Sequence, residues 1–576
     1  MRKPKYHLLK KTITLLLAAI APCGTLRAEQ EPPATMLGAA NHELVSFHKQ
    51  FDQAAMIPVA DNVHMAFAYE YANLSFIEGD DGVIAIDAGF YPNTTRRALD
   101  DYRKITSKPI KAVIYTHIHL DHTGGIDGLL EEHAERPTIY GPANWEHFVS
   151  ESTSVLMPMV MWRAFAQNGV LLPRGEHGAV GAGIGPVPTM QGIARIEPPH
   201  INIGERTRLN IAGVDLELIP TPGDIASSHM MVWLPDQKVL FAGDTLGGTF
   251  PYMETSRFEL DRDPAGFVTS LNLALGLEPE HVIAGHGRLL TGRSDVEDVL
   301  SINRDVIQFM IDQVERWIAK GHSADQIIDA FELPAVYAEH PDLQPHYHRI
   351  EWMIRGMYLK RAGFVGDVMD LSRHTDSEQA RRLIPLIGGE AATIEAAQKA
   401  LQDGDPRWAA SLAGYVLQVN PERKAAQQLR LAAFNAIAAN TNSSNERNRL
   451  LSELLRETGH INWTHLVQQV AFGTYQQQSV EALLDLFRIR VRPERAEGKN
   501  MIIKIAIENE DEDYYWSLNN SVLRRVQTAP SAHGTLALSK TTLLEIFVGK
   551  TDWQSAINAG KVSATGEAES FIPVIE

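Results

Sequence analysis

The sequence predicts an α/β domain near its N-terminus, followed by an all-α domain and then by an α+β domain. Three observations support this order. Short apolar, β-prone runs recur between residues 111 and 285, and several of them end at a polar side chain. Apolar residues recur at helical spacing over much of the stretch from 299 to 458. Alternating or apolar runs of strand length return after residue 500.

We expect four segments: a signal peptide at 1–28, the α/β domain at 45–320, the all-α domain at 321–458 and the α+β domain at 459–576. The first segment opens with Arg2, Lys3 and Lys5, and continues with an apolar run at 12–21 that is too short to span a membrane. The only cysteine, Cys23, lies inside it. We therefore expect a periplasmic or secreted protein with no stable membrane span.

Composition narrows the range of partners. The chain has 576 residues, of which 44% are hydrophobic and 22% are charged, which is typical of a globular protein of several domains. Its formal net charge is -18, and no basic stripe offsets the excess of acids. Because a nucleic acid is a polyanion, we expect no nucleic-acid partner.

Residues 116–122 read Thr-His-Ile-His-Leu-Asp-His, and the apolar run before them predicts a buried strand that ends at this motif. His117 and His119 are two positions apart, so an extended backbone directs both imidazoles to one side. Asp121 and His122 follow a turn and can face a second ion. Imidazole and carboxylate ligands without a thiolate suit zinc, or alternatively iron or manganese. The motif therefore predicts a metal centre.

The motif resembles the His-x-His-x-Asp-His signature of the metallo-β-lactamase superfamily. This resemblance implies a four-layered αββα sandwich with two divalent metal ions at one edge, for which zinc is favoured. Asp224, Asp244 and His286 each follow an apolar run in the order that the superfamily uses. The resemblance implies the following metal ligands: His117, His119 and Asp224 for the first ion, His122 and His286 for the second, Asp121 for one ion, and Asp244 between the two.

The same resemblance implies two catalytic residues. Asp121 would ligate one ion and orient the attacking water, and Asp244 would bridge both ions, which together lower the pKa of that water. The superfamily usually has a histidine where this chain has Asp224. His229 lies five residues further on, and it could complete the metal site, orient a ligand or contact the leaving group.

Longer segments resemble the alkylsulfatase branch of the superfamily. These segments are 73–80, 162–169 and 181–185 in the α/β domain, and 380–390 and 403–408 in the all-α domain. The resemblance implies that residues 321–458 form a dimerisation domain, hence a homodimer, and that 459–576 form a sterol-carrier-protein-like domain. It also implies hydrolysis of a sulfate ester in a small amphiphilic substrate, with the following candidate substrate contacts: Arg163, His229, Tyr252 and Arg257.

Two short segments follow the general superfamily instead of this branch. Residues 242–244 read Ala-Gly-Asp where alkylsulfatases typically carry Ala-Glu-Asn, and residues 284–287 read Ala-Gly-His-Gly where they carry Ser-His-His-Trp-Pro. We therefore keep two alternatives. One is a hydrolase of the same fold that acts on a lactone, a β-lactam or a phosphoester. The other is a non-catalytic lipid carrier.

Periodicity predicts the remaining elements. We expect a long amphipathic helix over 299–317 and tetratricopeptide-like helices at 393–401, 406–419 and 422–439. Beyond them we expect strand segments at 501–507 and 514–526, an acidic turn at 508–513 and a closing helix at 540–549. His346 and His348 are expected in a helix as ordinary surface or core residues.

Overall fold

The computed structural model describes residues 36–131, 135–143, 145, 155–192, 194–195, 197–223, 228–257, 262–363, 366–476, 478–529 and 531–576. The expected signal peptide at 1–28 and the expected ligand Asp224 lie outside these residues. Within them, no helix is both long enough and apolar enough to cross a membrane.

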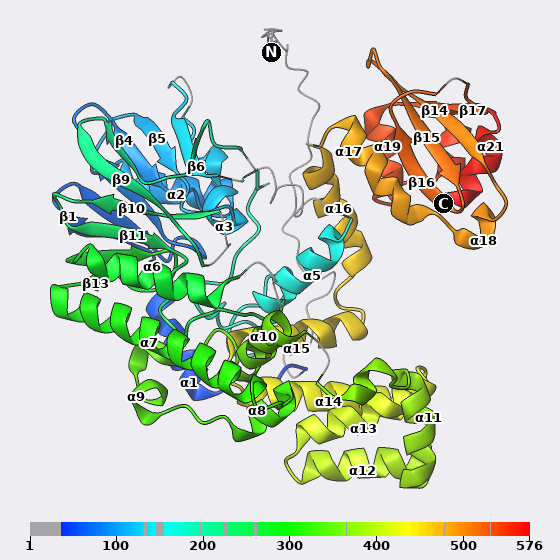
Figure 1. Cartoon of the computed structure of the whole chain (residues 1–576), viewed down its shortest axis with the longest axis horizontal. Coiled ribbons are helices and arrows are strands. Elements are labelled where there is room, and N and C mark those ends of the chain that lie inside the picture. Colours follow the sequence, from blue (N-terminus) through cyan, green and yellow to red (C-terminus); the bar gives the residue numbers. More distant parts are fainter. Residues whose placement is uncertain are drawn as a thin grey trace.

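Two mixed sheets form the N-terminal half of the protein (Figure 1). The first sheet has, in spatial order, the strands β1 (Ala55–Ala60), β2 (Val63–Phe67), β3 (Leu74–Glu78), β4 (Val83–Ile86), β5 (Ile110–Ile114), β6 (Thr138–Pro142) and β7 (Ile201–Ile203). The second has β13 (Leu290–Thr291), β12 (His281–Ala284), β11 (Val239–Gly243), β10 (His229–Leu234), β9 (Val214–Thr221) and β8 (Thr207–Ile211). Strands β4, β5, β6 and β7 are parallel, and so are β11 and β12.

The two sheets pack face to face, with helices on both outer faces. Successive side chains of a strand point to opposite faces, so Phe241 lies in the core between the sheets while Leu240 packs in the outer core. Ile114 and Val113 divide in the same way on the first sheet. The outer helices are α2 (Pro92–Tyr102) on the first sheet, and α6 (Pro264–Gly276) and α7 (Arg293–Ile318) on the second. The αββα sandwich predicted from the sequence is confirmed.

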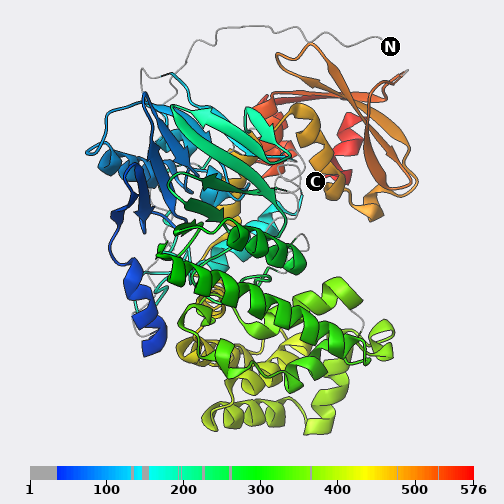
Figure 2. The ribbon, with the colours of Figure 1, turned by 60° about the vertical axis from the view of Figure 1, so that its left-hand side comes forward.

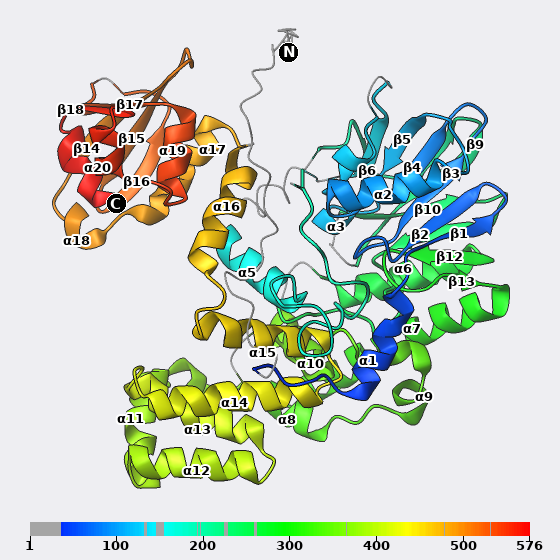
Figure 3. The same ribbon diagram turned by 180° about the vertical axis from the view of Figure 1, so that it is seen from behind.

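An all-α region follows the sandwich, as predicted (Figure 3). Its helices are α8 (Ala324–Ala330), α9 (Ala335–Ala338), α10 (Ile350–Ala362), the short helix η4 (Val368–Leu371), α11 (Asp376–Ile387), α12 (Glu390–Gln402), α13 (Pro406–Val419), α14 (Lys424–Asn440) and α15 (Ser444–Glu457). Helices α12, α13 and α14 pack as successive hairpins. Helix α5 (Met157–Gln167), which leaves the sandwich, packs against α15.

The last part is an α+β domain that stands apart from the helical region (Figure 2). Its helices are α16 (Trp463–Gln476), α17 (Val480–Leu486), α18 (Pro493–Ala496), α19 (Lys540–Phe547), α20 (Trp553–Asn558) and α21 (Ala568–Phe571). Its sheet has, in spatial order, β16 (Val522–Val526), β15 (Asp513–Asn519), β14 (Met501–Ile507), β17 (Gly534–Leu538) and β18 (Val562–Gly566).

Three expectations about elements need correction. The run at 514–526 is two strands instead of one, because Asn520 and Ser521 both adopt positive φ (50° and 59°) and close a two-residue hairpin turn. Helix α19 does not close the domain, since α20, β18 and α21 follow it. His346 and His348 lie in a bend before α10, not in a helix, and both are buried. The predicted domain boundaries stay predictions.

Candidate metal centre

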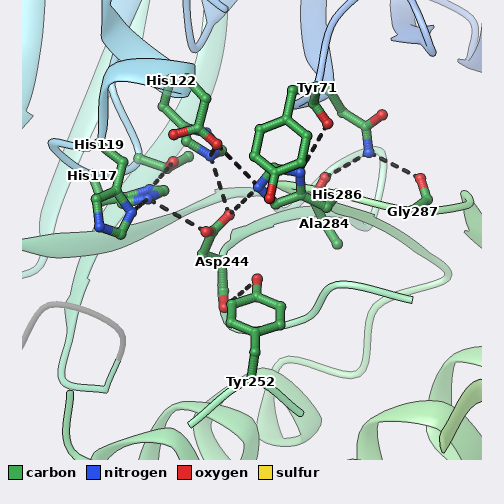
Figure 4. Close-up of polar contacts among 12 residues, drawn as sticks. Tyr71, His117, His119, His122, Asp244, Tyr252, Ala284, His286 and Gly287 are labelled. Carbon is green, nitrogen blue, oxygen red and sulfur yellow. Dashed lines mark hydrogen bonds and ion pairs between the residues drawn. The ribbon is translucent and has the colours of Figure 1, made fainter. Parts of the chain in front are cut away.

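The ends of parallel strands place the predicted ligands that the structure describes at one rim of the sandwich. His117 and His119 follow β5, Asp244 follows β11 and His286 follows β12. Helix α3 (Leu120–Thr123) then carries the remaining acidic and imidazole ligands of the motif. An isolated β-bridge between His117 and His229 joins the two sheets at this rim. Residues far apart in the chain therefore meet in one small volume (Figure 4).

The ligand side chains form two groups of three. In each group the ligand atoms all lie within 4.8 Å of one another, and the groups are His117, His119 and Asp244, and Asp121, His122 and His286. Four of these six residues are buried, and His119 and Asp121 are partly buried at the rim. Buried imidazoles and carboxylates aimed at a common point are the ligand set that a divalent ion such as zinc uses. The side chains therefore fit the expected metals.

Asp244, a member of the first group, also faces the second. Its Oδ2 is 3.6 Å from Nε2 of His117, while its Oδ1 is 3.2 Å from Nε2 of His122 and 3.4 Å from Nε2 of His286. One carboxylate thus faces both groups with different oxygen atoms. This geometry is compatible with the bridging role that the resemblance implies for Asp244, which stays a prediction.

Burial and charge act in opposite directions on the histidines. Burial lowers the pKa of His117 well below its ordinary value. Burial also opposes the charged form of His286, but the carboxylates of Asp244 and Asp121 outweigh it and raise the pKa to about 9. The pKa of His122 is raised well above its ordinary value in the same way. In the metal-free protein, these raised pKa values favour the protonated forms of His122 and His286.

Both acidic ligands are held in the ionised form. Burial opposes ionisation of Asp121, but His122 and His286 outweigh it and hold the pKa of that carboxyl well below its ordinary value. The same balance, with His286 as the largest opposing charge, lowers the pKa of Asp244. Charged carboxylates beside buried imidazoles make the rim ready to accept cations.

Asp87 supports the second group, and sequence reasoning did not identify it. Its Oδ2 lies 2.8 Å from Nδ1 of His122, while its Oδ1 accepts a hydrogen bond of 2.7 Å from the backbone N–H of Thr116. The residue follows β4 and has a φ of 61°, which Asp tolerates better than most residues. An acid directly after a buried strand, as at Asp244, was the available signal.

The loop before β3 supports His286 in a similar way. Nδ1 of His286 donates to the carbonyl oxygen of Tyr71 at 2.9 Å, which leaves Nε2 directed at the ligand carboxylates. The Tyr71 ring lies against the imidazole, with 4.7 Å between ring centroids. Asn73 donates to the carbonyl oxygens of Ala284 and Gly287 at 3.0 Å and so holds the strand end that carries His286.

His229 uses both ring nitrogens within the wall of the site. Its Nε2 accepts a hydrogen bond of 3.1 Å from the backbone N–H of Asp244, and its Nδ1 lies 2.7 Å from Oγ1 of Thr221. Because Nε2 accepts, Nδ1 carries the proton and donates to the hydroxyl. Burial lowers the pKa of His229 to about 4, so the ring is neutral. Of the three roles that the sequence leaves open, this geometry favours orientation of a ligand.

The other predicted substrate contacts lie nearby. The hydroxyl of Tyr252 donates to the carbonyl oxygen of Asp244 at 2.9 Å, so it faces the backbone, and the residue is buried. Nη1 of Arg163, on α5, donates to the carbonyl oxygen of Arg257 at 3.4 Å. Arg163 thus contacts the backbone of the chain segment that follows Asp244 and that carries Arg257. Their contact with a substrate stays a prediction.

Comparison with known families assigns all three regions. The metallo-beta-lactamase superfamily matches residues 69–286, the alkyl sulfatase dimerisation family matches 323–458, and the alkyl sulfatase C-terminal family matches 470–576. Fold and ligand arrangement together define a member of the metallo-β-lactamase superfamily. The chain therefore belongs to this superfamily. Its matches to the dimerisation and C-terminal families place it in the alkylsulfatase-like branch.

Individual relatives agree with this assignment. A linear primary-alkylsulfatase from Pseudomonas sp. (strain ATCC 19151) is 28% identical over 505 residues, which cover 85% of this chain and 95% of the relative. An (R)-specific secondary-alkylsulfatase from Pseudomonas sp. is 28% identical over 540 residues, covering 90% and 80% of the two chains. The solved structure of the stereoselective inverting sec-alkylsulfatase Pisa1 from Pseudomonas sp. has a TM-score of 0.78 at 24% identity and covers 95% of this chain and 88% of that one. That last likeness concerns the fold.

Proposed function

We propose that this protein is a metal-dependent hydrolase of sulfate esters, which releases an alcohol and inorganic sulfate. The observation that carries the proposal is the position of two ligand groups at the strand ends of a chain that matches an alkylsulfatase over 85% of its length. A small amphiphilic substrate, with an anionic head and an apolar tail, fits this assignment. Convergence of six ligand side chains speaks against a non-catalytic lipid carrier.

We propose two divalent ions, with zinc favoured. His117, His119 and Asp244 would hold one ion, with Asp224 as a further predicted ligand, and the second group would hold the other. When bound, the ions supply Lewis acidity that activates water and neutralises charge on the leaving oxygen. The two ions require neutral imidazoles, so loading removes the protons that the second group carries in the metal-free protein.

The protein's own residues would orient the reactants. Nε2 of His286 and Nε2 of His122 lie 3.3 and 3.5 Å from Oδ2 of Asp121, so both contacts use one carboxylate oxygen. The other oxygen can accept a hydrogen bond from the attacking water. The guanidinium groups of Arg163 and Arg257 are the candidate cations for the sulfate, because a fork of N–H donors suits a tetrahedral anion.

A second candidate function is hydrolysis of another bond, such as a lactone, a β-lactam or a phosphoester. Gly243 has a φ of 52°, and a Cβ atom there would lie 2.5 Å from Nε2 of His229 and 3.0 Å from Cβ of Thr116. The side chain of His229 therefore fills the space beside this position, where alkylsulfatases typically carry glutamate. This local difference is the reason to test other substrates.

We also propose that the protein is a homodimer outside the cytoplasm. Large apolar side chains are exposed in the region that matches the dimerisation family, among them Leu386 (83%), Val368 (73%) and Leu371 (67%). Such exposure in a helical region is typical of an interface with another chain. The basic and apolar composition of residues 1–28 supports export to the periplasm or the medium, which cell fractionation would test.

A substrate panel separates the candidate functions. Purified metal-replete protein is assayed with dodecyl sulfate, a lactone, a β-lactam and a phosphodiester, each with and without a chelator. Turnover of dodecyl sulfate that the chelator abolishes supports the proposal. Chelator-sensitive turnover of another substrate alone supports the second candidate, and retained lipid binding without any turnover would support a carrier.

A further inference from the structure

The segment from Gly247 to Arg257, here called the Tyr252 loop, follows Asp244 and lies between the sandwich and the helical region. Its central residue contacts the backbone of the metal centre, since the Tyr252 hydroxyl donates to the carbonyl oxygens of Asp244 at 2.9 Å and Leu246 at 3.2 Å. The ring is almost fully buried, with 3% of its surface exposed. The position of Tyr252 therefore fixes the backbone on which Asp244 stands (Figure 4).

Residues near the start of the helical region bind the first half of this loop. The carbonyl oxygen of Gln344 accepts hydrogen bonds from the backbone N–H of Phe250 at 3.1 Å and from Oγ1 of Thr249 at 2.5 Å. Nε2 of His348 donates to the carbonyl oxygen of Pro251 at 3.0 Å. These contacts join the loop to the segment that leads into α10.

A buried ion pair binds the second half of the loop. The carboxylate of Glu254 is fully buried and pairs with Nζ of Lys360 on α10, whose side chain is 15% exposed. Gly356, one turn earlier on α10, lets the carboxylate approach, because a Cβ atom there would lie 2.1 Å from Cγ of Glu254. The helix backbone and the charged side chain are thus fitted to each other.

Lys360 is also linked to Tyr252 through Arg262. Nζ of Lys360 donates to the carbonyl oxygen of Arg262 at 2.8 Å. Nη1 of Arg262 donates in turn to the carbonyl oxygen of Tyr252 at 3.2 Å, and its guanidinium carbon lies 5.5 Å from the centroid of the tyrosine ring. The ammonium group of Lys360 therefore holds in place both Glu254, two residues after Tyr252, and Arg262, which contacts Tyr252.

We propose that Lys360 is a positioning residue for the metal centre, which acts through Glu254 and Arg262 on Tyr252 and through Tyr252 on Asp244. A buried ion pair is weak support for stability, because apolar residues of similar volume often serve as well, but its directed contacts fix geometry. Helix α10 belongs to the region that matches the dimerisation family, so this region also shapes the metal centre. The kinetic part of this inference rests on the proposed function.

A double-mutant cycle between Lys360→Met and Tyr252→Phe tests the proposal in the full-length, metal-replete protein. The first readout is kcat and KM for dodecyl sulfate. Each single variant should lower kcat by roughly 10- to 100-fold, the scale on which a misplacement of about 1 Å acts, with KM changed less than about twofold. The double variant should be no slower than the slower single variant, because both changes interrupt one chain of contacts.

The second readout does not depend on turnover. The absorption spectrum of bound cobalt(II), added as the only metal, should change in the same direction in both single variants, and no further in the double variant. If the wild-type protein proves inactive toward sulfate esters, the proposed function fails, while the cobalt spectra still support or overturn the positioning role.

Three further variants exclude general loss of structure. Arg361→Met removes the next cation of α10, which pairs with Glu315 at the surface, and should leave kcat and the cobalt spectrum within error of wild type. Lys360→Arg should retain most of kcat, because it keeps the charge. If Lys360→Met fails to fold, the variant that combines it with Glu254→Gln removes the unpaired charge and should fold with a lowered kcat.

Three results would overturn the proposal. One is a cycle in which the two losses multiply. The second is a cobalt spectrum of folded Lys360→Met that equals that of wild type. The third is a combined Glu254→Gln and Lys360→Met variant with wild-type kcat.

Discussion

Oδ2 of Asp87 lies 2.8 Å from Nδ1 of His122, so a carboxylate outside the two ligand groups orients an imidazole of the second group. The bond directs Nε2 of the same ring toward Asp244, 3.2 Å away. Such outer carboxylates set the tautomer and the basicity of a ligand histidine. Asp87 therefore belongs to the metal centre, although it is 35 residues away in sequence from His122.

Asp87→Ala should weaken binding of the second metal ion. The expected loss is about 10- to 100-fold in affinity, the usual effect of removing such a partner. Competition with a chromogenic chelator measures it, and Asp81→Asn, at an exposed carboxylate in the turn before β4, serves as the control. Equal affinity in the Asp87→Ala and control proteins would exclude the role assigned to Asp87.

Asp224→Asn should reduce the metal content of the first group. The sequence predicts a carboxylate ligand at this position, and the described ligands of that group are His117, His119 and Asp244. Elemental analysis after dialysis should find close to one ion per chain in the variant and two in the wild-type protein. Two ions per chain together with unchanged turnover would remove Asp224 from the ligand set.

Metal loading should release protons at neutral pH. In the metal-free protein Asp244 and Asp121 overcome the effect of burial and raise the pKa of His286 to about 9, so its ring is charged at pH 7 and must lose a proton to become a ligand. Affinity for zinc should therefore rise with pH up to about 9. Calorimetric titration in buffers of different ionisation enthalpy counts the protons, and a count of zero would contradict the assignment.

The raised pKa of His286 also makes the stability of the metal-free protein depend on pH. Because the folded pKa of His286 exceeds the unfolded value of 6.5, its charged form adds stability that is fully present below pH 6.5 and is lost as pH rises through about 9. Chemical unfolding of the metal-free protein at pH 6 and pH 9.5 compares the two states. The His286→Gln variant should lose this part of the pH dependence.

Leu386→Glu should shift the protein from dimer to monomer. A charge at this exposed position of the region matched by the dimerisation family would be buried and unpaired in an interface that uses it. Light scattering after gel filtration gives the mass. Val522→Glu, at a residue of the α+β domain that is 50% exposed, should leave the mass unchanged. A Leu386→Glu protein that remains dimeric places the interface elsewhere.

Local patterns in the sequence, with the family resemblance that they carry, were enough to predict the sandwich and most of the side chains that the structure brings together at its rim. His117, His119, Asp121 and His122 lie within six residues of chain, and their spacing alone limits where the imidazoles can point. The hairpin at Asn520 and Ser521 was missed because both sides of the turn read as one β-prone run.

Supporting contacts could not be predicted, since they depend on residues that only the fold brings together. Tyr71 is 215 residues from His286, and the lysine of α10 lies 98 residues beyond the carbonyl group of Arg262 that it binds. The orienting role of His229 was only one of three that its sequence position allowed. The orienting role is distinguished from the other two by the approach of β10, which carries His229, to the backbone of Asp244.

Release of sulfate from dodecyl sulfate by the zinc-replete protein tests the central claim most directly. Our account predicts equal amounts of inorganic sulfate and dodecanol, loss of both products after chelation, and recovery when zinc is returned. His286→Ala should abolish release, while His281→Gln, at the start of the strand that His286 follows, should leave it within about twofold, as expected for a partly exposed position. Sulfate release that persists without bound metal, or that survives in His286→Ala, would contradict the account.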